Sequence, residues 1–384
     1  MTARRGLPTP ALLALAFGAL TLAACDGASP AGGDLIGEGG DPVVDTLAVG
    51  TLSVVEVADV SAGSALGSQP TQRRLLAGRA IDPTFGDVTA TAYVDFARPA
   101  LPENFAGRTP SAVSLIVPVS AYTYGDPAAS VTLGVAEVTG EWAADPDSLV
   151  AGQAIEVDAP FTTFTVPAAV DSVGSVTVPL SSSWVVTNDS LLTGSNYVSR
   201  FEGLAFVPQE GAAAVRGLNA SGIRLRVFVD GDSLDYFAAE VYTRVETTPP
   251  TGTAVRDGSG RALQLNLPLG ADSLRNSALS QARLVVRLDT VALQADGITR
   301  PVPEQLSLVG VREDSTRAVI SSAAVASGEV AFTGTTITRL IQDTIFGSPL
   351  FERYDVIVPA SPVTVDVAPY TSADLVLVRV PPVE

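Results

Sequence analysis

Apolar and polar residues alternate with a period of two along much of the chain. The clearest alternating segments cover residues 88–96, 223–229, 237–245 and 263–269. This period is typical of antiparallel strands that bury one face, and turn residues separate one segment from the next. Asp230-Gly231-Asp232-Ser233 lies between two of the segments and predicts a hairpin. The pattern therefore predicts an all-β protein.

Few segments have the period of a helix. The two candidates are Glu210–Leu218 and Ala271–Leu279. In the segment 237–245, the alternation places Phe237 and Val241 on the same face, which we expect to lie against the core. A polar segment with two adjacent prolines, Thr247–Gly252, predicts the boundary between two domains.

The N-terminus carries the most specific signal of the chain. Arg4 and Arg5 precede an apolar segment that runs from Ala11 to Leu22. This segment is too short to span a bilayer but suits the core of a secretory signal. Leu22-Ala23-Ala24-Cys25 then resembles a bacterial lipobox, which implies cleavage before Cys25 and attachment of lipid to it. The alternative is an ordinary signal peptide with a chance cysteine, but Cys25 is the only cysteine in the chain.

These signals divide the chain into four parts. We expect a lipoprotein signal peptide at residues 1–24, the lipidated cysteine and a glycine-rich tether at 25–42, and two β-sandwich domains at 43–248 and 249–384. The expected fold is two antiparallel, jelly-roll-like sandwiches behind a lipid anchor. Several acyl chains on one residue anchor a protein firmly. The predicted location is therefore the cell envelope, on the outer membrane, after export from the cytoplasm.

The composition removes most catalytic chemistry. The chain has no His, one Cys and no Lys, so all 23 basic residues are Arg. Ser-His-Asp and Cys-His nucleophile systems, His- or Cys-ligated metals and lysine Schiff bases are therefore excluded. No cofactor and no metal are expected. The net charge of −18 argues against nucleic acid as a partner.

Three short motifs follow one another along the chain. Gly78–Gly86 has the form G-x-x-x-D-P-x-F-G, Tyr124-Gly125-Asp126 forms a Y-G-D turn after the apolar segment Ala112–Val119, and Phe201–Leu204 has the form F-x-G-L. In this order and behind a lipobox, they resemble the secreted lipoproteins known as domain of unknown function 4270, found in Bacteroidetes and neighbouring phyla. The resemblance covers roughly residues 40–245. It implies a place at the cell surface but no catalytic residues, because the family has no assigned activity.

Carboxylates, acidic turns and tryptophans remain as candidate functional groups. A pair of carboxylates could catalyse hydrolysis as in glycosidases, and the 41 acidic residues supply pairs by chance. Calcium could bind the turns Asp145–Ser148 or Asp230–Asp232, although Asp and Gly are also simply good turn formers. Trp142 and Trp184 could form a sugar-stacking platform or belong to the core.

The favoured function is that of a non-enzymatic, membrane-anchored surface lipoprotein with a binding or envelope-structural role. The first alternative is a carbohydrate-binding module at the cell surface, and the second is a carboxylate-dependent hydrolase. The expected partners are the membrane, reached through the lipid, and polysaccharide or other envelope proteins. Cys25, as the lipid attachment site, is the one site residue that the sequence predicts.

Overall fold

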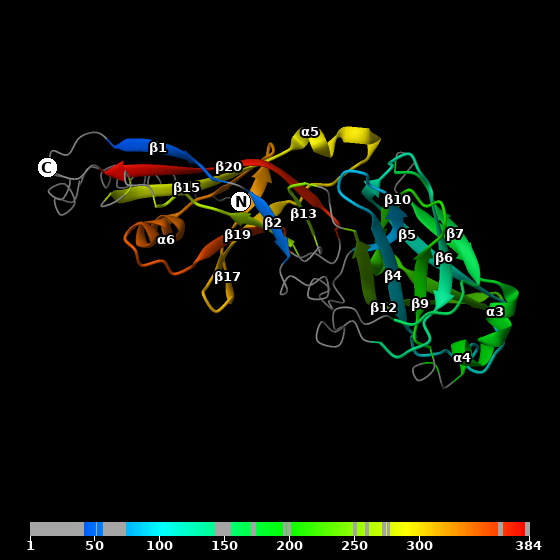
Figure 1. The fold of residues 1–384 in the computed structure, drawn as a ribbon. Helices are drawn as coiled ribbons and strands as arrows, with labels where there is room; N and C mark the ends of the chain where they lie inside the picture. Colours follow the sequence, from blue (N-terminus) through cyan, green and yellow to red (C-terminus); the bar gives the residue numbers. More distant parts are fainter. Residues whose placement is uncertain are drawn as a thin grey trace, which may run out of the picture.

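Two β modules lie next to each other in an elongated molecule (Figure 1). The computed structural model describes residues 42–50, 52–56, 74–142, 155–169, 174–194, 197, 201–248, 252–257, 261–270, 274, 277–359 and 364–380. Each module contains one ten-stranded sheet whose strands pair antiparallel, so the prediction of an all-β protein is confirmed. In the described ranges, no helix is both long and apolar enough to cross a membrane.

The first module is a sheet that curls around its own core. Its strands are β3 (Arg74–Ala80), β4 (Val88–Ala97), β5 (Ala112–Gly125), β6 (Val131–Glu137), β7 (Thr162–Val166), β8 (Ser175–Pro179), β9 (Leu204–Pro208), β10 (Ala214–Asn219), β11 (Arg224–Val229) and β12 (Asp232–Thr247). They pair in the order β12-β11-β5-β10-β3-β4-β9-β6-β7, with β8 on β5. β12 also pairs with β4, which closes the sheet around the core. Two short helices, α3 (Ser182–Thr187) and α4 (Asp189–Thr193), lie at the end remote from the second module (Figure 1).

Local alternation accounts for β4 and for the β11–β12 hairpin. β4 buries every second residue from Val88 to Phe96, as its pattern predicts. The hairpin turn consists of Asp230 and Gly231, which have φ angles of 48° and 92°. Two successive residues with positive φ form the turn that suits the twist of paired strands, and Asp-Gly is a preferred sequence for it.

β12 departs from the predicted alternation at a β-bulge. Its register against β4 shifts between Ala238 and Val241. A bulge adds one residue to one strand and so changes which residues face inward. Tyr236 is consequently buried, whereas Phe237 is 51 % exposed. The prediction that Phe237 faces the core is therefore wrong, while Val241 is buried as predicted.

The segment Glu210–Leu218 does not form the predicted helix. It contains most of β10, which pairs with β3 on one edge and β5 on the other. Pairing on two edges outweighs the weak helical preference of this alanine-rich segment. The second candidate, Ala271–Leu279, lies partly outside the described residues. Its last two residues are the first two of the strand β15 (Ala278–Leu288).

The second module has two layers joined by one strand. Its strands, besides β15, are β1 (Val43–Ala48), β2 (Ser53–Glu56), β13 (Ala254–Arg256), β14 (Arg261–Leu265), β16 (Gln305–Val311), β17 (Arg317–Ala326), β18 (Glu329–Phe332), β19 (Arg353–Ile357) and β20 (Val367–Val380). One layer is β1-β20-β15-β18, with β13 on β20, and the other is β16-β19-β14-β2. β17 pairs with both β18 and β16. The helix α6 (Thr335–Ile345) packs on β15 through Ile337, Leu340 and Ile341, whose spacing forms one helical face.

The N-terminal strands belong to the second module, which corrects the predicted start of the first domain at residue 43. β1 pairs with β20 and β2 pairs with β14. Arg379 also forms an ion pair with Asp45. Residues 43–48 and 53–56 therefore form the two edge strands of the sheet of the second module, and the first module begins at β3. The chain passes back to the second module between Thr247 and Ala254, at the polar segment that predicts a boundary.

Candidate functional site at the junction of the modules

Cys25, the predicted lipid attachment site, lies outside the described residues. The acidic turn Asp145–Ser148, one of the two predicted calcium turns, lies outside them as well. In the other predicted calcium turn, Asp232 Oδ2 accepts a hydrogen bond from Asn104 Nδ2 at 2.7 Å. Asp230 lies 4.0 Å from Arg108. These carboxylates tie the hairpin to a neighbouring loop. Within the described ranges, no three His, Cys, Asp or Glu side chains are grouped to hold a metal ion.

Both tryptophans belong to apolar clusters. Trp184 is 5 % exposed, and its ring stacks on Phe161 with 5.4 Å between the ring centroids. Trp142 is half-buried against Tyr93 and Tyr242. Its Nε1 donates a hydrogen bond to the carbonyl of residue 202 at 2.6 Å. Trp184 therefore belongs to the core, and Trp142 packs half-buried against a smaller cluster.

Asp95 and Asp366 both have the raised pKa that a hydrolase uses, and burial is the main cause for each. Burial, followed by the charges of Glu240 and Glu202, raises the pKa of Asp95 to about 6 against a backbone hydrogen bond that lowers it. Asp95 lies on β4 of the first module. An open groove of about 360 Å³ lies in the second module instead, and Glu352 is the only acidic residue that lines it. The structure therefore does not bring a carboxylate pair together in this groove.

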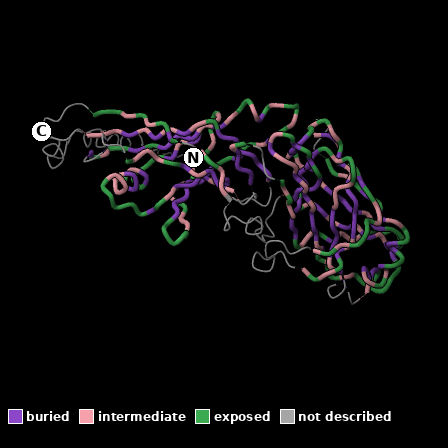
Figure 2. The backbone as a smooth tube through the Cα atoms, in the orientation of Figure 1, coloured by how far each residue is buried: buried purple, intermediate pink, exposed green. Residues whose placement is uncertain are grey.

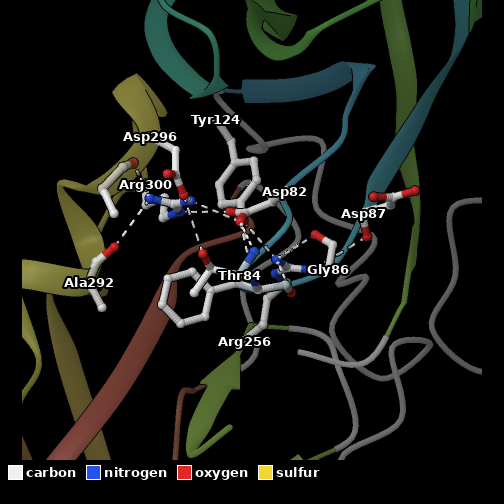
Figure 3. Close-up of polar contacts among 11 residues, drawn as sticks. Asp82, Thr84, Gly86, Asp87, Tyr124, Arg256, Ala292, Asp296 and Arg300 are labelled. Atoms are coloured by element: carbon white, nitrogen blue, oxygen red, sulfur yellow. Dashed lines mark hydrogen bonds and ion pairs between the residues drawn. The ribbon is translucent and has the colours of Figure 1, made fainter. Parts of the chain in front are cut away.

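The D-P-x-F-G motif forms a turn between the two modules. Asp82 Oδ1 accepts hydrogen bonds from the backbone N–H groups of Thr84 at 2.9 Å and Phe85 at 3.0 Å. The backbone carbonyl of Asp82 accepts a further bond from Gly86 N–H at 2.8 Å. An aspartate commonly closes its own turn in this way. The turn leaves Oδ2 of Asp82 directed at Arg300 of the second module (Figure 3).

Arg300 and Asp82 form a buried ion pair with two hydrogen bonds. Arg300 Nε donates to Oδ2 at 2.7 Å and Nη2 donates to Oδ1 at 2.9 Å, and both side chains are 0 % exposed. Arg300 Nη1 donates to the carbonyls of Ala292 at 3.2 Å and Ala295 at 2.6 Å. Burial alone would raise the pKa of Asp82, but the hydrogen bonds from Arg300, Tyr124 and the turn outweigh burial and lower it to about 2. Asp82 is therefore ionised at neutral pH.

Tyr124 and Arg256 extend this network (Figure 3). Tyr124 donates its hydroxyl hydrogen to Asp82 Oδ2 at 2.7 Å and accepts a bond from Arg256 Nη2 at 2.7 Å. Arg256 Nη2 also donates to the carbonyls of Phe85 at 2.6 Å and Gly86 at 3.1 Å. Burial raises the pKa of Tyr124 well above its ordinary value, so its hydroxyl stays protonated and able to donate. Arg256, on β13, thus holds the turn from the side of the second module.

The Y-G-D motif makes a second set of contacts across the junction. Gly125 and Thr299 exchange two backbone hydrogen bonds, of 3.0 and 2.8 Å. Close by in sequence, Tyr122 donates its hydroxyl hydrogen to Asp366 Oδ1 at 2.9 Å and accepts a bond from Val365 N–H at 2.8 Å. Both motif turns therefore contact the second module.

An apolar cluster fills the junction around these polar contacts. It draws side chains from both modules, so the junction is a continuous core and not a wet contact between two finished domains. Its buried members are Leu76, Ala80, Phe85, Val88, Ala90, Tyr124 and Val215 from the first module and Ala254, Val365 and Val367 from the second.

The F-x-G-L motif serves the core of the first module instead. Phe201 is buried and packs edge-on against Trp184. Gly203 has a φ of 96°, and a Cβ at this position would lie 2.3 Å from the carbonyl oxygen of Val94. Only glycine fits so close to the neighbouring strand, which explains the residue type at this point of the motif.

Sequence reasoning singled out Asp82 and Tyr124 within motifs but missed their partners Arg256 and Arg300. It also missed Asp366, the partner of Tyr122. No local pattern distinguishes these two arginines among the 23 of the chain. The partners of Asp82 and Tyr124 lie on a different module, and only the fold brings them together.

Comparisons with protein-family models, with curated proteins and with solved structures gave no match. The role of the junction is therefore inferred from its own contacts. Its carboxylate, its tyrosine hydroxyl and its guanidinium groups all make the hydrogen bonds described above. These hydrogen bonds hold the two modules in one orientation. The contact around Asp82, Tyr124, Arg256 and Arg300 is called the joint between the modules below.

Proposed function

We propose that this chain is a non-enzymatic surface lipoprotein, anchored by lipid on Cys25 to the outer membrane and serving in binding or in envelope structure. The observation that carries the proposal is the position of the only cysteine, directly after Leu22-Ala23-Ala24 at the end of an apolar segment. The mature chain then begins with the glycine-rich tether and enters the second module through β1.

The junction supports a structural or display role. Two modules joined by a flexible linker sample many relative orientations. A buried ion pair and a shared apolar core favour one orientation, because any other leaves Asp82 and Arg300 buried without partners or exposes the cluster around Phe85. One fixed shape suits a protein that presents a surface at a set distance from the membrane.

The chemistry of the chain supports a role without catalysis. Histidine is the side chain that titrates near neutral pH without perturbation, and the chain has none. Neither carboxylate with a raised pKa, Asp95 or Asp366, lines the groove that contains Glu352. The two tryptophans give the sugar-binding alternative little support, because Trp184 is buried in one cluster of the first module and Trp142 is half-buried against another.

We also propose membership of the lipoprotein family known as domain of unknown function 4270. The support comes from the three motifs that carry the resemblance. Two of them, around Asp82 and Gly125, form the joint between the modules, and the third places Gly203 against a neighbouring strand. Each of these residues has a structural role that depends on its residue type, which is what we expect of the residues of a family motif.

Fractionation of the Cys25→Ala variant tests the proposed function. We expect wild type to enter the detergent phase on phase separation and the variant to appear as an unprocessed precursor or as released protein. Gly40→Ala, in the tether, is the matched control and should behave like wild type. A Cys25→Ala variant that fractionates and migrates like wild type contradicts the lipid anchor.

A panel of polysaccharides, peptides and esters, run beside a glycan array, tests the absence of catalysis. We expect no turnover. Turnover that Asp95→Asn abolishes would contradict the non-enzymatic role, and glycan binding without turnover would favour the carbohydrate-binding alternative.

A further inference from the structure

The second module exposes a short apolar segment after α6. Phe346 is 57 % exposed and Leu350 is 53 % exposed. Every residue from 346 to 350 is exposed (Figure 2). Pro349 lies between them and lines the groove of the second module. Two large apolar side chains exposed within five residues make this segment a candidate contact surface.

This segment lies at the end of the module where the chain enters from the tether. Val43, the first residue of β1, pairs with Arg379, and Arg379 pairs with Leu279 on β15. Leu279 N–H donates to Gln342 Oε1 at 2.5 Å, and the Gln342 carbonyl accepts the N–H of Phe346 at 3.0 Å. Two strand spacings of about 4.8 Å, the Gln342 side chain and one helical turn of about 5.4 Å therefore link the start of β1 to Phe346.

The tether keeps this end near the anchor. Residues 26–42 separate Cys25 from β1. The glycine-rich sequence predicts a tether with a root-mean-square end-to-end distance of about 20–25 Å. β20 runs for 14 residues from the junction, at Val367, to the end of the module where β1 starts, and the first module lies beyond the junction (Figure 1). That strand alone spans about 45 Å, so the second module lies nearer to the lipid than the first.

We propose that residues 346–350 form a second, reversible contact with the lipid surface and that the first module points away from the membrane. This inference rests on the proposed lipid anchor. The occupant is the boundary between headgroups and acyl chains, which accepts aromatic and aliphatic side chains such as Phe346 and Leu350. A weak contact is sufficient, because the tether holds lipid at high effective concentration.

The contact is apolar and not electrostatic. Arg339 pairs with Asp343 on α6, and Arg353 pairs with Asp355 on β19. Each arginine that flanks the exposed segment thus has an acidic partner, and Asp355 pairs with Arg317 as well. The net charge of the chain is negative, which gives no general attraction to anionic lipid. The contact should therefore persist at high salt and on zwitterionic vesicles.

Tryptophan fluorescence in vesicles of phosphatidylcholine with brominated acyl chains tests the proposal, since bromine quenches only nearby indoles. The full-length lipidated protein is used. Its native tryptophans, Trp142 and Trp184, both lie in the first module and report on that end of the molecule. Phe346→Trp is the test variant. Phe237→Trp is the matched control, because Phe237 is 51 % exposed in the first module.

We expect brominated lipid to reduce the emission of Phe346→Trp, relative to unbrominated lipid, and to leave Phe237→Trp and wild type unchanged. Unquenched Phe346→Trp, or equal quenching of the two variants, overturns the proposal. The emission of Phe346→Trp could instead change with protein concentration and be the same in brominated and unbrominated lipid. That result would also overturn the proposal and would indicate contact with a second copy of the chain. Flotation with the vesicles is scored separately, because loss of flotation means that the lipid anchor itself, and so the proposed function, has failed.

Discussion

Arg300 donates two hydrogen bonds to the carboxylate of Asp82, a residue 218 positions earlier in the chain. The two residues belong to different modules, and neither side chain is exposed. Charges taken out of water are tolerated only when they are paired and hydrogen-bonded. The pair therefore acts mainly on specificity, because it penalises every arrangement of the modules that separates Asp82 from Arg300.

Removing one partner of this pair should destabilise the protein strongly. Arg300→Met leaves the Asp82 carboxylate buried without its main partner, and we expect the free energy of unfolding to fall by about 3–5 kcal/mol. Denaturant unfolding of the mature chain measures this loss. Arg339→Met is the control, because Arg339 forms an exposed pair with Asp343 and should cost less than about 0.5 kcal/mol. Equal, small losses in the two variants would contradict the role of the buried pair.

The junction should also couple the unfolding of the two modules. The shared core around Phe85 and Val367 predicts a single calorimetric transition for wild type. Arg256→Met removes the bonds to Phe85, Gly86 and Tyr124 and should separate the transition into two. Two transitions already present in wild type would show that the modules unfold independently.

Gly125 should not tolerate a side chain. Its φ is 111°, and a Cβ there would lie 2.6 Å from the carbonyl oxygen of Ala213. We expect Gly125→Ala to lower the free energy of unfolding by about 1–3 kcal/mol through backbone strain and displacement of the Thr299 bridge. Gly140→Ala is the control, because a Cβ at Gly140 meets nothing within 4 Å. A Gly125→Ala variant as stable as Gly140→Ala would be inconsistent with the close approach.

Asp366 should make the stability fall as the pH rises from about 4 to about 6. Burial, opposed by the hydrogen bond from Tyr122, raises its pKa from 3.8 to about 6. The folded state therefore binds more protons than the unfolded state in this window, so stability is greatest below it and is lost as the pH rises through it, by at most about 3 kcal/mol. Burial raises the pKa of Asp95 to about 6 as well, with the same sign. Asp82 has the opposite sign, and its contribution is lost as the pH falls from about 4 towards 2.

Urea unfolding at a series of pH values checks this dependence. Asp366→Asn should flatten the decline between pH 4 and 6, and Asp95→Asn should flatten it independently, because the two residues lie in different modules. An unchanged slope in Asp366→Asn would show that this carboxylate does not titrate in the window.

The sequence predicts features that depend on neighbouring residues. The alternation in β4 and the Asp230-Gly231 turn need only local information, and both are confirmed. A bulge is set by the partner strand, so the alternation in β12 misplaces Phe237. The alanine-rich segment before Asn219 forms a strand because β3 and β5 flank it, which its own composition does not reveal.

The joint between the modules escapes sequence reasoning for the same reason. Asp82 and Tyr124 stand out in motifs, but Arg256 and Arg300 acquire their roles only when the second module docks. The pairing of residues 43–56 with β20 and β14 likewise depends on strands that follow the whole first module. Residues so far apart in the chain form no local motif, so the sequence pattern does not predict that they pair.

Mass spectrometry of the N-terminal peptide from the membrane fraction tests the central claim most directly. A surface lipoprotein should yield a peptide that begins at Cys25 and carries the added mass of acyl chains, with residues 1–24 removed. A mature peptide that begins at another residue, or an unmodified Cys25 in membrane-derived protein, would contradict the lipid anchor and the function built on it.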